Sequence, residues 1–291
     1  MAGHAVILRH DGPLDLQSTL FSGQAFRWRA EDGWFRGVVS GRAVRLRGAP
    51  EGVEVDSRDE DGMLATRVRD YLSLDTDIEG IYRAMSFDDR LRDAISRYRG
   101  MRVLRQDPWE CLVSFICSSA SNIPRITGNI ESICETFGAP VEGGSNGLYA
   151  FPTPEALAAD GAARRMRELG LGYRAEYIEA TARSVADGAV DLMALREAPY
   201  DTGLDALMSL DGVGDKVANC VMLFSLDKPD AFPVDTWSDK AMREWYLEGA
   251  SIPKTKMRLW AMERFRGYAG YANHYLFHDR RIRDARPDGG S

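Results

Sequence analysis

The sequence predicts an α+β protein in which an antiparallel β-sheet comes first and a larger helical region follows. Between residues 5 and 60, apolar and polar residues alternate in short runs separated by turns that contain glycine. This pattern is typical of half-buried strands. From about Asp61 onward, the apolar residues recur at helical spacing instead. The length of 291 residues is enough for two domains that share an interface.

The individual elements follow from these patterns. Strand-like alternation covers three runs, at 25–29, 34–39 and 43–47. Asp75, Asp77 and Asp88 are candidate caps or first-turn acids of the early helices, and Asp107-Pro108 has the form of a capped helix start. Helical spacing then predicts helices at 123–137, 154–159, 161–169, 173–187, 203–210, 214–226, 236–247, 254–266 and 268–281. We expect one domain over 1–104, a helical domain over 105–285 and a disordered tail over 286–291.

The composition limits the classes of protein to which the chain can belong. Hydrophobic residues make up 44% and charged residues 28%, which is ordinary for a soluble globular protein. No run approaches the roughly 20 apolar residues that span a bilayer, so we expect a cytosolic protein without a membrane partner. The four cysteines form no CxxC pair, so no metal site built from side chains and no cofactor are expected. The net charge of −7 argues mildly against a nucleic-acid partner, unless basic residues form a local positive face.

The segment 207–224 is the most informative part of the chain. Helical spacing leads into Gly212-Val213-Gly214 and resumes immediately afterwards, which predicts a helix–hairpin–helix. Its glycines allow close approach to a DNA phosphate, which the free N–H groups of the second helix can bind. A structural cation on the carbonyls of Met208, Leu210 and Val213 is also compatible with such a turn. A helical turn that happens to contain Gly-Val-Gly is the plainer alternative.

Lys216 falls in the first turn of the second helix and is the first of only five lysines in the chain. A cation at that end of a helix opposes the helix dipole by roughly 0.3–1 kcal/mol. Burial adds a further preference for the neutral amine, which is the nucleophile of imine chemistry. Taken alone, a lysine at such a turn is more often a phosphate contact. Asp235 opens the next helix in Pro233-Val234-Asp235, where it is expected both to cap the helix and to face the same cleft.

Several longer motifs resemble the 8-oxoguanine DNA glycosylases of the helix–hairpin–helix (HhH-GPD) superfamily. The resemblance covers about residues 14–281 and includes the hairpin with its lysine and the aspartate that follows. Its other motifs are Ser22-Gly-Gln-Ala-Phe26, Leu104-Arg-Gln-Asp-Pro-Trp-Glu-Cys, Leu169-Gly-Leu-Gly-Tyr173-Arg174 and Leu226-Asp-Lys-Pro-Asp-Ala-Phe-Pro-Val-Asp235. The resemblance implies a TBP-like N-terminal sheet domain and a helical catalytic domain whose last helix, 268–281, closes a base pocket.

The resemblance also implies roles for individual residues. Lys216 would attack the sugar C1′ of 8-oxoguanine in duplex DNA, and Asp235 would stabilise the cationic transition state before β-elimination nicks the strand. The flipped base would be held by Gly23, Cys220, Asn273 and Phe277. Tyr173 would be the wedge in the duplex, and Arg125, Arg174 and Asn122 would read the opposite cytosine. Tyr173 and Phe277 could equally be core residues.

This chain departs from the family pattern at four positions. Ala120 stands in a run that is commonly all asparagine, so selectivity for the opposite base is expected to be relaxed. Trp237 replaces a usual histidine, Arg280 occupies a position that is often acidic, and Asn273 is one methylene shorter than the usual glutamine. These changes bear on specificity more than on the lyase step.

Two other functions stay open at this point. One is a helix–hairpin–helix glycosylase for a different damaged base, although the alkylpurine enzymes lack the hairpin lysine. The other is a non-catalytic DNA-binding protein that uses its hairpin for phosphate contacts alone. In either case we expect a monomer that binds double-stranded DNA, in the cytoplasm with the nucleoid or, in a eukaryote, in the nucleus.

Overall fold

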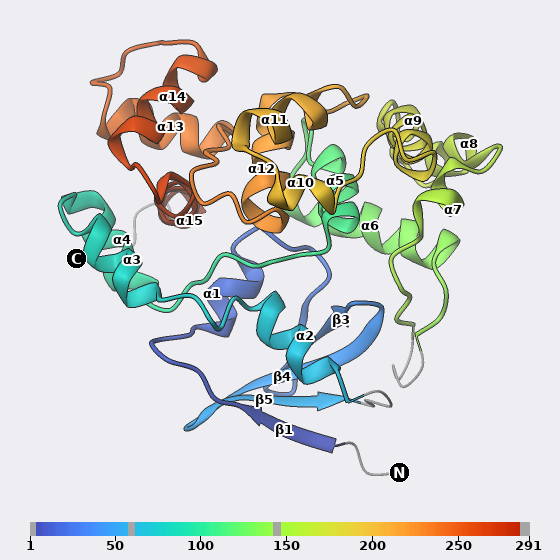
Figure 1. The fold of residues 1–291 in the computed structure, drawn as a ribbon, viewed down its shortest axis with the longest axis horizontal. Coiled ribbons are helices and arrows are strands. Elements are labelled where there is room, and N and C mark those ends of the chain that lie inside the picture. Colours follow the sequence, from blue (N-terminus) through green and yellow to red (C-terminus); the bar gives the residue numbers. More distant parts are fainter. Residues whose placement is uncertain (1–3, 58–61, 142–146, 286–291) are drawn as a thin grey trace.

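The computed structural model describes residues 4–57, 62–141 and 147–285. It contains a five-stranded antiparallel sheet below a larger assembly of helices (Figure 1). The strand order is β1-β5-β4-β3-β2, and every neighbouring pair is antiparallel. The predicted α+β architecture is therefore confirmed. The strands are β1 (His4–Leu8), β2 (Arg29–Glu31), β3 (Trp34–Val39), β4 (Arg42–Ala49) and β5 (Gly52–Ser57).

The predicted strand at 25–29 is wrong, because only Arg29 belongs to a strand. The other residues run between the two halves of the molecule, which bury them from opposite sides. Phe26 packs edge-on against Phe115 of the helical part, whereas Trp28 donates a hydrogen bond of 2.8 Å to the hydroxyl of Tyr71. The alternation of apolar and polar residues at 25–29 thus reflects burial in two different cores and not the two faces of a sheet. A helix, α1 (Leu16–Phe21), also interrupts the region that was expected to be all β.

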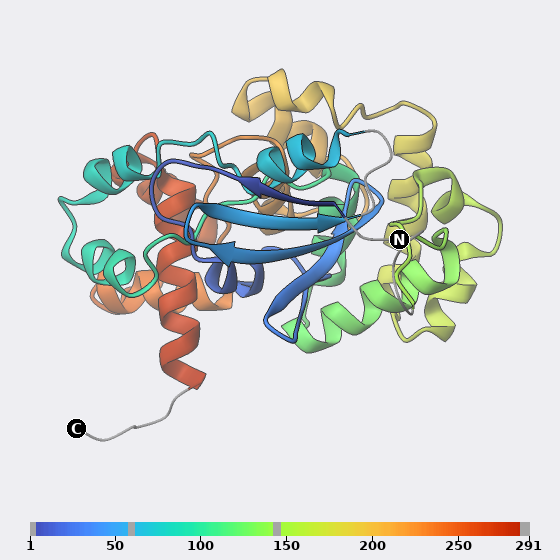
Figure 2. The same ribbon diagram turned by 90° about the horizontal axis from the view of Figure 1, so that it is seen from below.

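Three helices link the sheet to the rest of the chain: α2 (Leu64–Tyr71), α3 (Ile78–Met85) and α4 (Asp89–Arg97). Asp77 and Asp88 cap α3 and α4 as predicted, whereas Asp75 instead pairs with Arg105. α2 covers the sheet and shares its core, while α3 and α4 contribute to the core of the helical part. Figure 2 shows α3 and α4 beside the long helix α15 (Ala269–Ala285), and α4 packs against it.

The helical part is organised around α5 (Pro108–Cys117). Nine of its ten residues are buried, and it packs against α6 (Ile123–Phe137), α9 (Arg174–Ala186) and α12 (Asp215–Ser225). Asp107 caps this helix by accepting the Glu110 N–H, as the sequence predicted. The remaining helices are α6 (Ile123–Phe137), α7 (Pro154–Ala158), α8 (Ala162–Glu168), α9 (Arg174–Ala186), α10 (Ala194–Glu197), α11 (Tyr200–Met208), α12 (Asp215–Ser225), α13 (Thr236–Trp245) and α14 (Lys254–Arg264). Each predicted helix has a counterpart among them, and α10 was not predicted. The tail at 286–291 lies outside the described residues.

Candidate active site

The predicted hairpin is the turn between α11 and α12. Gly212 has a φ of +75°, and a Cβ atom there would lie 2.7 Å from the side chain of Tyr177. Both the backbone conformation and the close contact therefore favour glycine. Val213 is buried beneath the turn, whereas the Cβ position of Gly214 meets nothing within 4 Å. The turn thus presents an open backbone surface where α12 begins.

The hydrogen bonds of the hairpin bear on the predicted cation site at Leu210. The Leu210 carbonyl accepts the Val213 N–H at 3.2 Å. A carbonyl oxygen has two lone pairs, so this bond leaves Leu210 able to bind a cation as well. Among the described residues, no group of three or more His, Cys, Asp or Glu side chains has the arrangement of a metal site.

Lys216 lies in the first turn of α12, and its side chain points toward the end of α5. The Nζ atom donates a hydrogen bond of 2.6 Å to Ser118 Oγ and lies 5.0 Å from the centre of the Phe115 ring. The neighbouring carboxylate, Asp215, is held by Arg258 of α14 at 3.0 Å. The amine is therefore placed by a hydroxyl and an aromatic ring, while the nearest acidic residue in the sequence is engaged elsewhere.

Asp235 is the N-cap residue of α13. Its Oδ1 atom accepts hydrogen bonds from the backbone N–H and the hydroxyl of Ser238, at 2.8 and 2.7 Å. The Ser238 hydroxyl also bridges to the Asp235 N–H, which completes a capping box. Within the described part of the chain, Oδ2 accepts no hydrogen bond. The cap thus fixes the carboxylate and leaves one oxygen available to a ligand.

Lys216 and Asp235 line the same cavity, which has a volume of about 520 Å³. All four residues predicted to hold the base line it as well: Gly23, Cys220, Asn273 and Phe277. Gly23 has a φ of +94°, and a Cβ there would lie 3.5 Å from the Phe277 ring and 3.1 Å from Ile123. A side chain at this position would narrow the space beside Phe277.

Two of these pocket residues have further constraints. Burial raises the pKa of the Cys220 thiol to about 12, so the side chain is a neutral, apolar surface at physiological pH. Asn273 is buried, and its Nδ2 atom donates to the Pro233 carbonyl at 2.9 Å. This bond ties α15 to the segment that carries Asp235. It also uses one of the amide N–H groups of Asn273, a side chain that was predicted to contact the base.

The residues predicted to meet the opposite strand gather around the loop after α5. Tyr173 is 54% exposed, and the guanidinium carbon of Arg174 lies 4.7 Å from the centre of its ring. Arg174 itself is only 4% exposed, because it donates to the carbonyls of Ser119 and Ala120 at 3.0 and 3.2 Å. Ala120 has a φ of +48°, an unusual conformation for a residue other than glycine or asparagine.

Arg125 and Asn122 lie at the start of α6. Asn122 is the N-cap of that helix and accepts the Arg125 N–H at 3.0 Å, and Asn122 also lines the cavity. The Arg125 side chain is exposed and has a long hydrogen bond of 3.4 Å to the Gly170 carbonyl. Arg125 is therefore much freer than Arg174 to contact a ligand.

Several residues of the cavity wall were not predicted from the sequence. Ser118 is the C-cap of α5, and its contact with Lys216 depends on how α5 and α12 pack. Arg281 follows Phe277 by four residues on α15, a helical spacing that indicates a shared face. His274 also lines the cavity, and burial lowers its pKa to about 3, so the ring is neutral at physiological pH. Trp237 lines the cavity too, whereas Arg280 pairs with Glu244 and Asp284.

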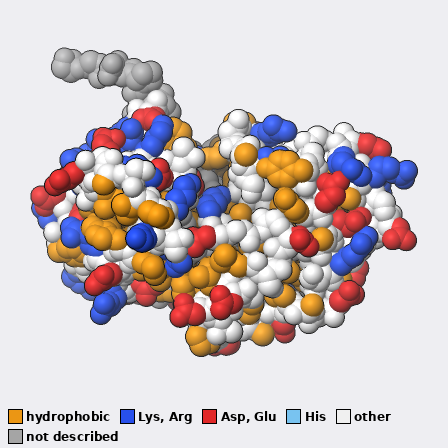
Figure 3. Space-filling view, turned by 90° about the horizontal axis from the view of Figure 1, so that it is seen from above, with side chains coloured by type: hydrophobic (Ala, Val, Ile, Leu, Met, Phe, Trp, Pro, Cys, Tyr) orange, Lys and Arg blue, Asp and Glu red, His pale blue; other side chains and the backbone are white. Residues whose placement is uncertain are grey.

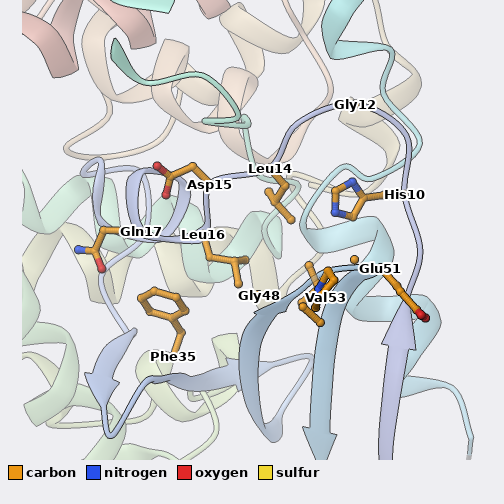
Figure 4. Close-up of a pocket in the computed structure, with 13 residues that line it drawn as sticks. His10, Gly12, Leu14, Asp15, Leu16, Gln17, Phe35, Gly48, Glu51 and Val53 are labelled. Carbon is orange, nitrogen blue, oxygen red and sulfur yellow. The ribbon is translucent and has the colours of Figure 1, made fainter. Parts of the chain in front are cut away.

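A second hollow, of about 720 Å³, lies between α1, the segment that precedes it and the β4–β5 turn (Figure 4). Its wall includes His10, Asp15 and Phe35, while Glu51 points away from the other labelled side chains. None of the residues predicted to act in catalysis lines it. The smaller cavity is thus the candidate active site, because it alone of these two contains Lys216 and Asp235.

Charge on the molecular surface is mixed. On the face seen from above, Lys and Arg side chains are interspersed with Asp and Glu (Figure 3). Among the described residues of this face, the basic side chains form no single continuous patch. In the same described part of the chain, no helix is long and apolar enough to cross a membrane.

The fold and the cavity together define a helix–hairpin–helix protein with a lysine and an aspartate in one base-sized pocket. Residues 6–112 match the family model described as the 8-oxoguanine DNA glycosylase N-terminal domain. Residues 113–266 match the model of the HhH-GPD superfamily base excision DNA repair protein. The chain therefore belongs to the HhH-GPD superfamily and, within it, to the N-glycosylase/DNA lyase family.

Individual relatives agree with this assignment. A probable N-glycosylase/DNA lyase of Methanothermobacter thermautotrophicus is 31% identical over 93% of this chain and 94% of its own length. The N-glycosylase/DNA lyase OGG1 of Arabidopsis thaliana is 33% identical over 91% of this chain and 76% of its own. Among solved structures, the Clostridium acetobutylicum 8-oxoguanine glycosylase/lyase in complex with DNA containing cytosine opposite 8-oxoguanine is similar. It has a TM-score of 0.90 and 32% identity, and the match covers 96% of each chain.

Proposed function

We propose that this protein is a bifunctional DNA N-glycosylase and AP lyase that excises 8-oxoguanine from double-stranded DNA in base excision repair. The observation that carries the proposal is the shared cavity of Lys216 and Asp235, at the hairpin expected to bind DNA phosphate. The cavity is also large enough for a purine and has apolar walls at Phe277 and Cys220. Family membership restricts the reaction to base excision.

The chemistry starts with the neutral amine of Lys216, which forms a bond to C1′ of the damaged nucleotide. The C1′–N9 bond breaks, its electron pair leaves with the base, and the base takes up a proton. The Lys216 nitrogen loses one proton, the C1′–O4′ bond breaks, and O4′ takes up a proton as the sugar ring opens, which leaves a protonated imine to C1′. Removal of a C2′ proton then expels the 3′ phosphate, which cleaves the strand by β-elimination.

Asp235 supports the first of these steps. As C1′–N9 breaks, positive charge develops on the sugar, and a fixed carboxylate stabilises that charge without having to reorganise. The capping box supplies the rigidity, because Ser238 binds Oδ1 from two directions and leaves Oδ2 for the substrate. Ser118, which accepts a hydrogen bond from Lys216, is a positioning residue for the amine.

Recognition of the base is assigned to the opposite wall. The Gly23 carbonyl accepts the N7–H that 8-oxoguanine has and guanine lacks, and Phe277 and Cys220 sandwich the ring. Unstacking the base costs a few kcal/mol, which the exposed Tyr173 offsets by filling the gap in the duplex. Gly212, Val213 and Gly214 hold a phosphate of the lesion strand through their backbone, with a structural cation on neighbouring carbonyls as a further prediction.

The opposite strand is read by Arg125 and Arg174, whose guanidinium groups suit the O2 and N3 acceptors of cytosine. Asn122 supports Arg125 through the α6 cap. Ala120 leaves space where the family commonly carries an asparagine, so we expect a weaker preference for cytosine. The protein acts as a monomer, in the nucleoid of a prokaryote or the nucleus of a eukaryote.

Borohydride trapping tests the proposal. Sodium borohydride reduces an imine, so the wild-type protein should become covalently attached to duplex DNA that contains 8-oxoguanine opposite cytosine. Lys216→Gln should abolish attachment and slow strand cleavage by at least about 1,000-fold, because it removes the nucleophile. DNA binding should change little. A protein that binds this DNA but is never trapped would be the non-catalytic alternative, and wild-type cleavage by Lys216→Gln would exclude Lys216 as the nucleophile.

A further inference from the structure

Arg281 lies on the cavity wall beside the residues assigned to the base. It lies one helical turn after Phe277 on α15, and its guanidinium carbon is 5.6 Å from the centre of the Phe277 ring. Its Nη1 atom is 3.6 Å from the position that a Cβ of Gly23 would occupy. The guanidinium group therefore borders the space between Gly23 and Phe277, where the resemblance to the family places the damaged base.

The hydrogen bonds of Arg281 leave part of its donor capacity unused. Nη2 donates to the Phe21 carbonyl at 3.1 Å and lies 3.2 Å from His278 Nδ1. Nε is buried without a partner, and Nη1 has no hydrogen bond among the described residues. The guanidinium group is thus held by hydrogen bonds at Nη2 only, and Nη1 lies toward the cavity.

The charge of Arg281 is also unpaired in the described part of the chain. The arginines before and after it on α15 differ: Arg280 pairs with Glu244 and Asp284, and Arg283 pairs with Asp279. Burial lowers the pKa of Arg281, which the charge of Asp235 opposes, but an arginine stays protonated in proteins. A half-buried cation without a carboxylate partner is costly unless a ligand supplies acceptors.

We propose that Arg281 is a specificity-determining residue that donates a hydrogen bond from Nη1 to a carbonyl oxygen of the flipped purine. This inference rests on the proposed function. In 8-oxoguanine, two carbonyl oxygens, O6 and O8, flank N7–H, so a donor next to Gly23 meets one of them when the Gly23 carbonyl accepts N7–H. Asn273 has fewer free donors for this role, because one of its two amide N–H groups already donates to Pro233.

A purely structural role is the competing explanation. Arg281 holds the Phe21 carbonyl and lies near Asp235, so its loss could disturb the pocket without any contact with the base. The two explanations differ for a preformed abasic site, which contains the sugar but no base. A base-reading residue matters for excision of 8-oxoguanine and not for β-elimination at an abasic site, whereas a structural residue matters for both.

The test compares Arg281→Leu with the wild-type protein under single-turnover conditions, on 8-oxoguanine opposite cytosine and on an abasic site. We expect base release to fall about 10-fold, the loss typical of one good base contact, with abasic-site cleavage unchanged within about two-fold. Arg281→Lys, which retains the charge and a donor, should restore part of the rate. It also keeps the test open if the leucine variant does not fold. Arg283→Leu is the matched control, because Arg283 is exposed and pairs with Asp279 outside the cavity, and this variant should match the wild type.

A third substrate identifies which purine oxygen, O6 or O8, Arg281 contacts. 8-Oxoadenine keeps O8 and N7–H but carries an amine in place of O6. An equal loss on both lesions assigns the contact to O8, and a loss confined to 8-oxoguanine assigns it to O6. Unchanged excision by Arg281→Leu, or an equal loss on the abasic site, would overturn the inference and leave the proposed function intact. A wild-type protein that cleaves abasic sites but releases no 8-oxoguanine would overturn both.

Discussion

Lys216 and Asp235 lie at the starts of α12 and α13. Arg125, Arg174 and Tyr173, at the starts of α6 and α9, instead surround the loop that follows α5. The two helix starts are fixed by local backbone rules: a glycine turn before α12 and a capping box before α13. The loop is fixed by tertiary bonds, since Arg174 reaches the carbonyls of Ser119 and Ala120. The backbone of Lys216 and the carboxylate of Asp235 are thus placed by their own sequence neighbours, whereas the Arg174 side chain is placed by distant carbonyls.

Departures from the family pattern fall in both regions, because Ala120 lies in the loop and Trp237 lies two residues after Asp235. A change near Lys216 or Asp235 would disturb a helix start as well as the reaction. The loop tolerates Ala120 in a left-handed conformation, because its carbonyl is held by Arg174. We therefore expect variation in the loop to change what is recognised opposite the lesion and to leave the reaction in place.

After the loss of Lys216 itself, the largest effect should come from removing the charge of Asp235 while preserving its cap. Asparagine is as good an N-cap residue as aspartate, so Asp235→Asn should fold normally. Base release should nevertheless fall about 100-fold, since one preorganised electrostatic contact is worth roughly that much. Single-turnover release of 8-oxoguanine measures the effect, with Asp77→Asn at the α3 cap as the control. A normal rate in Asp235→Asn would mean that the carboxylate only caps its helix.

A smaller effect concerns α15, which packs against α13. Burial lowers the pKa of His274 to about 3 and that of His278 to about 4. Above about pH 6.5 both rings are neutral in the folded and the unfolded chain. As the pH falls below that value, only the unfolded chain takes up these protons. The free energy of unfolding should therefore fall by up to about 1.4 kcal/mol per pH unit for each ring, until the folded-state pKa is reached.

Denaturant unfolding between pH 7 and pH 4.5 checks this expectation. His274→Gln cannot titrate, so its free energy of unfolding should depend less on pH than that of the wild-type protein by about one proton's contribution. Equal slopes for the two proteins would show that His274 is not buried as a neutral ring.

The smallest expected effect is a difference between substitutions of Arg125 and Arg174, the two arginines beside the loop. Arg125 is exposed, so Arg125→Ala should lower the preference for cytosine about five-fold, at the low end for a base contact, with little change in melting temperature. Arg174→Ala should weaken the same preference and also destabilise the protein, because it frees the carbonyls of Ser119 and Ala120. Excision rates against all four opposite bases, together with thermal melts, measure both quantities. Equal excision rates opposite all four bases, in the wild type and in both variants, would show that neither arginine reads the opposite base.

Features set by local sequence could be predicted, whereas features set by packing between distant elements could not. The hairpin, the cap at Asp235 and every helix from α5 onward except α10 were predictable, because local spacing and capping determine them. The strand predicted at 25–29 failed, since Phe26 and Trp28 are buried by two separate cores. Ser118 and Arg281 were missed because packing between helices, and not a local pattern, brings them to the cavity. The bond from Asn273 to Pro233 was likewise beyond any pattern.

The most direct measurement identifies the residue that carries the sugar. The trapped complex with 8-oxoguanine DNA can be digested and its modified peptide sequenced by mass spectrometry. The chain has only five lysines, at 216, 228, 240, 254 and 256, so the assignment is unambiguous. We expect the modification on Lys216 alone. A modification on any other lysine or on the N-terminal amine would contradict this expectation.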